Sequence, residues 1–167
     1  MPCTRTIWLF LCLSAAVAAQ TMPAADECAT AADALVAGIN PAPGASGVTY
    51  SVAGATTSAS STCVSLNRDV WFTYVAATSA VVRFSTCTPA GFAAGSMSDS
   101  VMALYDACGG TQIACNDTSP CGTRAELTAA LVGGVSYRLR VGEYGTITPS
   151  ATTFYVTVTV LPADAYD

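Results

Sequence analysis

The sequence predicts an all-β protein, a jelly-roll-like antiparallel β-sandwich of about eight strands with a short N-terminal helix. Three observations predict this fold. From residue 69 onward, apolar and polar residues alternate with a period of two, which is the pattern of half-buried strands. Turns rich in Gly, Pro, Asn and Asp recur between these segments, as they do in sandwiches. Six cysteines follow an apparent export signal, which indicates disulfide cross-links.

The N-terminal residues have the features of a cleaved secretion signal. Arg5 precedes an apolar block over residues 7–17, and residues 16–20 offer small side chains to signal peptidase. No later segment has the length of a membrane span, so we expect no membrane insertion. The expected location is secreted, extracellular or at the cell surface. The predicted organisation is a signal peptide over 1–19, an N-terminal segment and linker over 20–47, and a β-sandwich over 48–162 to which a disulfide joins that segment.

A helix and then a series of strands are predicted along the mature chain. The helix is expected over residues 27–37, because Asp26 can cap it, alanine favours it and Gly38 would end it. Strands are expected over 69–76 and 80–86, paired through a hairpin at residues 77–79. In the second of these strands Val82 and Phe84 point inward, and Arg83 and Ser85 point outward.

The second half of the chain continues the β pattern. Residues 100–106 are almost entirely apolar, which predicts a central strand covered on both faces. Further strands are expected at 111–115, 124–131 and 135–143, the last two joined by a hairpin at Gly133 and Gly134. The final strand is expected over 153–161. Its predicted inward residues are Phe154, Val156, Val158 and Val160, and its predicted outward residues are Tyr155, Thr157 and Thr159.

Disulfides explain the cysteines of the mature chain. The zinc alternative lacks a C-x2-C pair and a His to complete a mixed site. Because Cys115 and Cys121 flank a short turn, and Cys87 and Cys108 each end a strand, we expect bridges between cysteines that are adjacent in sequence. The predicted pairs are Cys28 with Cys63, Cys87 with Cys108, and Cys115 with Cys121.

Composition and charge exclude several functions. Six basic residues face eleven acidic ones, and the chain has neither Lys nor His. An acidic surface repels phosphate backbones and anionic headgroups, so no nucleic-acid partner is expected. Without His, Ser-His-Asp and Cys-His catalysis is impossible. A carboxylate pair such as Glu126 and Glu143 stays open for glycoside cleavage, but both are better explained as exposed strand residues. We expect no enzyme.

Several segments in order resemble a known family. They read D-E-C-A-T-A, D-V-W-F-T-Y, V-V-R-F-S-T-C, D-S-V-M-A-L-Y-D-A-C-G-G, I-A-C-N-D and S-Y-R-L-R-V-G-E-Y-G, with T-F-Y-V-T-V-T-V at the end. Over residues 26–161 the chain is similar to bacterial pre-peptidase C-terminal (PPC-like) domains in their cysteine-bearing, secreted form. The resemblance implies a non-catalytic sandwich that is often stabilised by calcium and appended to exported proteins. We expect no catalytic domain beside the sandwich, which departs from that habit.

Calcium is the cofactor that the sequence suggests. Ca2+ takes six to eight oxygen ligands from loops, and the chain places carboxylate and amide oxygens at strand ends and in a cysteine-flanked turn. The resemblance implies metal at the Asn-Asp pair and at the N-terminal acid. The alternative is that these are ordinary turn residues that bond to their own backbone. The candidate ligands are Asp26, Glu27, Asp99, Asp106, Asn116 and Asp117.

Two features of the sequence indicate sugars: possible attachment positions and aromatic side chains that could bind a glycan. Asn116 begins an Asn-Asp-Thr glycosylation sequon, and the hydroxyl-rich segment 49–62 offers Thr56, Thr57 and Ser58 for O-linked glycans, although a polar edge strand and its loop explain that segment better. Exposed aromatic side chains are also candidates for a glycan-binding platform. The candidates are Tyr50, Tyr144 and Tyr155.

Two functions remain open. The first is an extracellular structural protein that assembles with copies of itself into a surface fibre or matrix, with residues 20–39 docking on a neighbour's sheet edge. The second is a monomeric, calcium-stabilised module that binds glycan or another extracellular protein. The Gly- and Pro-rich stretch at 40–47 and the low charge favour the first.

Overall fold

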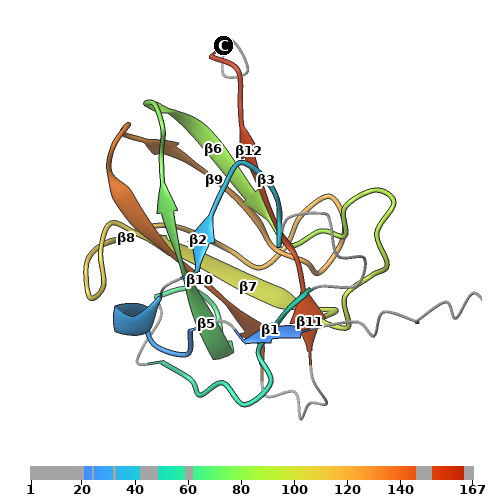
Figure 1. The fold of residues 1–167 in the computed structure, drawn as a ribbon. Helices are drawn as coiled ribbons and strands as arrows, with labels where there is room; N and C mark the ends of the chain where they lie inside the picture. Colours follow the sequence, from blue (N-terminus) through green and yellow to red (C-terminus); the bar gives the residue numbers. More distant parts are fainter. Residues whose placement is uncertain are drawn as a thin grey trace, which may run out of the picture.

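The computed structural model describes residues 21–23, 25–31, 33–41, 49–58, 62–145 and 152–163, with the backbone alone described for 21–23. The predicted signal peptide, residues 1–19, lies outside these ranges. The described chain folds as a β-sandwich (Figure 1). Its elements in order are β1 (Thr21–Pro23), the 3-10 turn η1 (Cys28–Thr30), β2 (Ala34–Leu35), β3 (Gly38–Asn40), β4 (Thr49–Ser51), β5 (Leu66–Val75), β6 (Ala80–Ser85), β7 (Ser100–Tyr105), β8 (Gln112–Asn116), β9 (Glu126–Leu131), β10 (Ser136–Tyr144), β11 (Thr153–Phe154) and β12 (Val156–Val160).

Two main sheets enclose the apolar core. The larger sheet has the strand order β2-β5-β10-β7-β8, and the smaller has β3-β12-β6-β9. A further three-stranded sheet, β1-β4-β11, completes the fold. Side chains from the two main sheets interlock between them: Tyr74 of β5 meets Phe84 of β6 edge to face, with ring centroids 5.2 Å apart. The predicted all-β sandwich is confirmed, although β1–β4 and β2–β5 pair in parallel.

The central strand predicted at 100–106 is β7. It lies between β10 and β8, and its inner side chains Met102 and Leu104 join the core. On the outer face Val101 and Ala103 pack with Leu66 in a second apolar cluster. Both faces of β7 are therefore covered, as expected. The strands predicted at 111–115, 124–131 and 135–143 are also present, as β8, β9 and β10.

Both predicted hairpins are wrong. β5 pairs with β10, and β6 pairs with β9, so the chain crosses from one sheet to the other at residues 76–79 and again at 132–135. The period-two pattern marks which residues face the core, and it is the same whether the next strand lies beside the first or opposite it. Only the packing of the two sheets decides between a hairpin and a crossing.

The two crossings lie against each other at one end of the sandwich, which we call the arch end. The amide of Gly134 donates to the carbonyl of Ala76 at 2.8 Å, and the amide of Ala76 donates to the carbonyl of Val135 at 3.3 Å. A Cβ on Gly133 would lie 2.8 Å from the amide nitrogen of Ser79. Of the two glycines predicted to make a hairpin turn, Gly133 therefore allows two backbones to approach closely, and Gly134 adopts a positive φ of 76°.

The predicted N-terminal helix is also wrong. Residues 28–30 form only the short turn η1, and the chain then runs extended along the edge of β5, where the amide of Thr73 donates to the carbonyl of Asp33 at 2.9 Å. Leu35 is buried by this path. Pairing with a sheet edge and burial of Leu35 outweigh the helix preference of the alanines. In the described part of the chain, no helix has the length and apolar character needed to cross a membrane.

The predicted final strand, 153–161, divides at Tyr155. Phe154 belongs to β11 and pairs with β4, whereas β12 pairs with β3 and β6. Tyr155, predicted to face outward, is buried and lies edge to face with Phe92. Val160, predicted to face inward, is 46% exposed at the arch end. One strand that serves two sheets cannot keep a single inward face, so the alternation fails at Tyr155, whereas Val160 is exposed at the end of β12.

The six cysteines that follow the predicted signal peptide all form disulfides, as predicted, but none of the predicted pairs is present. Bridges between sequence neighbours are wrong because each bridge joins elements far apart in the chain. The first ties the N-terminal segment to the turn after β7, the second ties the segment before β5 to β8, and the third joins the loops that follow β6 and β8. The observed pairs are Cys28–Cys108, Cys63–Cys115 and Cys87–Cys121.

Candidate functional site

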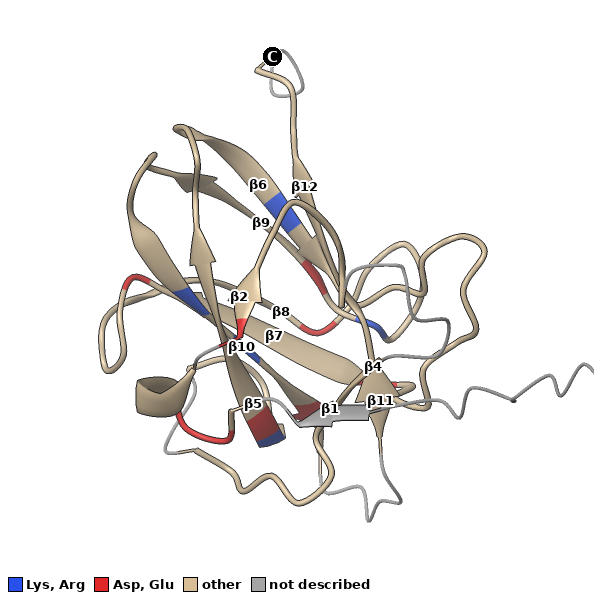
Figure 2. Cartoon of the chain, viewed as in Figure 1, with Lys and Arg blue, Asp and Glu red and all other residues tan. Residues whose placement is uncertain are grey.

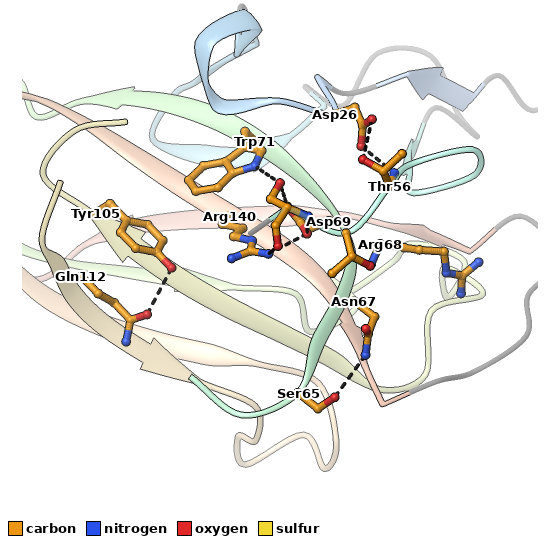
Figure 3. Close-up of polar contacts among 12 residues, drawn as sticks. Asp26, Thr56, Ser65, Asn67, Arg68, Asp69, Trp71, Tyr105, Gln112 and Arg140 are labelled. Carbon is orange, nitrogen blue, oxygen red and sulfur yellow. Dashed lines mark hydrogen bonds and ion pairs between the residues drawn. The ribbon is translucent and has the colours of Figure 1, made fainter. Parts of the chain in front are cut away.

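A buried ion pair lies on the outer face of the larger sheet. β5 and β10 are neighbours, and strand alternation directs Asp69 and Arg140 away from the core (Figure 3). An Nη2 of Arg140 lies 2.8 Å from an Oδ1 of Asp69, and the two side chains are 1% and 0% exposed. Figure 2 shows how sparse charged residues are along the ribbon. A fully desolvated pair in such a chain needs further polar partners.

Ser58 supplies those partners. Its amide and hydroxyl donate to the two carboxylate oxygens of Asp69 at 2.9 and 2.6 Å. Its carbonyl accepts from Arg140 at 2.9 Å, and its hydroxyl accepts from the indole nitrogen of Trp71 at 3.0 Å. Burial alone lowers the pKa of Arg140, but the hydrogen bond and charge of Asp69, with a contribution from Tyr105, outweigh it and raise that pKa above its ordinary value. The guanidinium therefore stays charged.

A half-open cleft of about 360 Å³, which we call the outer cleft, lies over this network. The rings of Trp71 and Tyr105 have centroids 5.4 Å apart, and the guanidinium carbon of Arg140 lies 5.4 Å from the Trp71 ring centre. The Tyr105 hydroxyl donates to Gln112 at 3.2 Å. Pockets that hold small ligands have comparable volumes and a similar mixture of aromatic and polar walls. The lining residues are Glu27, Cys28, Ser58, Trp71, Tyr105, Gly109, Gly110 and Arg140.

The walls of the outer cleft come from segments distant in sequence. Glu27 and Cys28 belong to the N-terminal segment, while Gly109 and Gly110 belong to the turn between β7 and β8. The Cys28–Cys108 disulfide joins these two walls directly. The cleft therefore exists only when the N-terminal segment is fastened to the sheet.

The predicted calcium ligands are dispersed. Asp26 accepts from both the amide and the hydroxyl of Thr56, at 2.7 and 3.0 Å, and Asp106 accepts from the amide of Thr111 at 2.7 Å. Glu27 lines the outer cleft. Within the described ranges, no group of three or more His, Cys, Asp or Glu side chains is arranged to hold a metal ion.

The other three predicted ligands lie nearer to one another. Burial raises the pKa of Asp99, and the charge of Asp117 adds to that rise, so these two carboxylates interact. The side-chain nitrogen of Asn116 donates to the backbone carbonyls of Thr118 and Glu126, at 2.9 and 2.8 Å. The Asn116 oxygen accepts from the amide of Asp117 at 2.9 Å. Asn116 thus has the hydrogen bonds of a turn residue.

The predicted glycosylation positions are occupied by internal contacts. The side-chain nitrogen of Asn116, which would carry an N-linked glycan, makes the two hydrogen bonds described above. In the hydroxyl-rich segment, Thr56 donates to Asp26, Thr57 accepts from the amide of Arg68 at 3.0 Å, and Ser58 joins the buried network. These hydroxyls fasten residues 56–58, the hydroxyl strap, to the sheet. Attached sugars stay a prediction for these positions.

The aromatic platform expected from the sequence does not assemble. Tyr50 and Tyr155 are both 4% exposed and pack inside, whereas Tyr144 is exposed. The carboxylates considered for glycoside cleavage also lie apart, because Glu126 is on β9 of the smaller sheet and Glu143 is on β10 of the larger. Glu143, expected to be exposed, is buried and forms an ion pair with Arg68.

The residues of the outer cleft were missed as a site at the sequence level, although their strands were predicted. Alternation in 135–143 already places Arg140 outward, and the same rule places Asp69 and Trp71 outward on β5. An outward acid beside an outward Trp on one strand, with an outward Arg on another, is the signal that was present. This pattern does not reveal the strand order, so it could not show that β5 and β10 are neighbours.

A family comparison assigns this sandwich to a known class. Residues 24–156 match the model of a family described as galactose binding domain-like and associated with T9SS, the type IX secretion system. The match spans most of the chain, so the chain belongs to this family of β-sandwich domains. No curated protein and no solved structure matches it. Domains of this family are generally non-catalytic, and the association with T9SS suggests secretion or a place at the cell surface. The PPC-like resemblance is not confirmed.

The buried ion pair generates a prediction about stability. We expect Arg140→Met to lower the free energy of unfolding by about 3–5 kcal/mol, because it leaves the Asp69 carboxylate buried without a counter-charge. The matched control is Arg83→Met, which breaks a pair with Glu126 whose side chains are 43% and 23% exposed, and should cost about 0–1 kcal/mol. Urea unfolding measures both, and equal losses would contradict the role assigned to Arg140.

Proposed function

We propose that this protein is a secreted, non-catalytic module that binds carbohydrate at an extracellular surface, and that the outer cleft is its ligand site. The outer cleft is the observation that carries the proposal: it is a pocket of ligand size with two aromatic walls over a rigid polar floor. The family gives independent support, since its description is that of a galactose-binding-like domain.

The chemistry of the outer cleft suits a sugar ring. Tyr105, which is half-buried, offers apolar ring surface on which the C–H face of a sugar packs, and Trp71, which is 7% exposed, lines the cleft beside it. Glu27 offers carboxylate oxygens that accept hydrogen bonds from sugar hydroxyls. Trp71 and Arg140 are already fixed by Ser58 and Asp69, so little side-chain freedom would be lost on binding.

Filling the outer cleft tests the proposal. Glu27 is exposed and its side chain makes no capping hydrogen bond to η1, so Glu27→Trp places a large ring at the cleft without removing a cap. We expect the affinity for the strongest ligand found on a glycan array to fall at least about tenfold, roughly 1.4 kcal/mol, when measured by titration calorimetry.

The control for this test is Val132→Trp, which adds the same ring to a 58% exposed position at the arch end. Its binding should equal that of the wild type. If Glu27→Trp also binds like the wild type, the ligand site lies elsewhere. If the wild type binds no glycan, the proposed function is wrong.

Self-association into a surface fibre or matrix is a second candidate, favoured by a patch at the arch end. Neighbouring residues bring the exposed valines close together. Val36 follows Leu35, which pairs with Tyr74, and Val75 is next to Tyr74 on β5. The amide of the following residue, Ala76, donates to the carbonyl of Val135. Contiguous exposed apolar surface of this kind is a feature of association sites. The members of this arch-end patch are 39% to 58% exposed and comprise Val36, Val75, Val132 and Val135.

Sedimentation velocity tests the second candidate. If the protein self-associates through the arch-end patch, we expect its sedimentation coefficient to rise with concentration, and Val132→Glu to abolish the rise by placing a charge in the apolar contact. Ile113→Glu, at a 41% exposed position on β8, is the control and should leave association intact. A wild-type protein that sediments as a monomer at every concentration would exclude this candidate.

Calcium stabilisation is a third proposal, placed at Asp99 and Asp117. Without calcium at pH 7, we expect Asp99→Asn to raise the melting temperature, because it removes a charge that burial and Asp117 disfavour. Because the pKa of Asp99 is raised, this side chain destabilises the folded wild type only while it is charged. The difference in melting temperature between the variant and the wild type therefore shrinks as the pH falls through that pKa. If calcium binds, it should raise the melting temperature of the wild type and not of Asp99→Asn. A wild-type melt that does not respond to calcium would end this proposal.

A further inference from the structure

We propose that the outer cleft selects sugars that carry no acidic group and discriminates against their uronic acid counterparts. This inference rests on the proposed carbohydrate-binding function and concerns the charge of the ligand. It follows from two observations: the charge of Arg140 in the lining of the cleft is paired with Asp69, and the rim of the cleft carries acidic side chains.

The cation in the cleft is already compensated. Arg140 lies at the floor, where its Nη2 donates to the carboxylate of Asp69 at 2.8 Å and to the carbonyl of Ser58 at 2.9 Å. Its side chain is 1% exposed. A guanidinium whose charge is matched by a buried carboxylate adds little net attraction for an incoming anion. Arg140 therefore orders Trp71 and the hydroxyl strap, and it leaves no net positive charge at the floor.

The rim of the cleft is acidic. Glu27 lines the cleft directly, Asp26 precedes it, and Asp106 follows the cleft residue Tyr105. Figure 2 shows acidic positions in the loop that leads into η1. The whole chain carries a formal net charge of −5, so its long-range field also opposes anions. Arg138 lies opposite Tyr105 on β10, where its guanidinium donates to Ser136 and to the carbonyl of Tyr137, and it is outside the lining of the cleft. A carboxylate on the ligand would therefore meet like charge at the rim and no uncompensated cation among the residues that line the cleft.

Neutral sugars meet no such penalty. A hexose presents C–H groups to the aromatic walls and hydroxyl donors to Glu27, and both contacts are favourable. Oxidation of its C6 from CH2OH to a carboxylate keeps the ring hydroxyls unchanged and adds one negative charge. A hexose and the corresponding hexuronic acid therefore form a matched pair that isolates the effect of charge.

The experiment compares matched pairs of immobilised hexoses and hexuronic acids in the galacto, gluco and manno configurations. For the configuration that binds, we expect the neutral member to bind about two- to fivefold more tightly at low salt, the range of an exposed charge interaction. Rising salt should reduce this ratio, because screening weakens repulsion and leaves neutral binding unchanged.

Glu27→Gln should lower the neutral-to-acid ratio, since it removes the carboxylate nearest to the ligand. Glu126→Gln removes the same charge from the smaller sheet and should leave the ratio unchanged. The inference is overturned if the acid binds as well as the neutral sugar, or if the ratio does not respond to salt and to Glu27→Gln. Equal binding of both members overturns charge selection alone, whereas no binding by any probe overturns the proposed function together with it.

Discussion

The ion pair between Asp69 and Arg140 is the constraint on which the outer face of this protein depends. Two charged groups removed from water need good mutual geometry and additional hydrogen bonds to offset the cost of desolvation. Ser58 makes three hydrogen bonds to the ion pair and accepts a fourth from Trp71. These bonds hold the hydroxyl strap against the sheet. Ser58 follows from this requirement, because its hydroxyl and backbone groups satisfy a buried pair in a chain that is poor in charge.

Covering segments and disulfides complete the same face. The larger sheet needs a cover over β5, β10 and β7, and the N-terminal segment and the residues before β5 provide it. Cys28–Cys108 and Cys63–Cys115 fasten these irregular segments to the ordered sheet. Cross-links of this kind limit the freedom of the unfolded chain, and they matter most for segments with few regular hydrogen bonds. The outer cleft is the space left where two covers meet, so its shape depends on both.

This origin explains the chemistry of the outer cleft. The wall residue Trp71 and the floor residue Arg140 are held in place by hydrogen bonds to Ser58 and Asp69, and the rim is acidic because Glu27 is on a solvent-facing turn. A site with fixed aromatic walls and a neutralised cation at its floor favours shape and hydroxyl contacts over charge attraction. These properties agree with a carbohydrate-binding module of the galactose-binding-domain-like family. They also separate this cleft from the loop carboxylates Asp99 and Asp117, where calcium is proposed.

The sequence by itself determined the all-β class, most strand positions and the involvement of all six cysteines in disulfides, because alternation and composition are local properties. Tertiary structure decided the rest. Alternation cannot distinguish a hairpin from a crossing between sheets, so β5 and β10 became neighbours only in the folded chain. Burial of Leu35 against a sheet edge replaced the predicted helix, and the disulfides followed three-dimensional proximity. The candidate site escaped sequence analysis for the same reason, since Ser58, Trp71, Tyr105 and Arg140 come together through long-range pairing that no local pattern encodes.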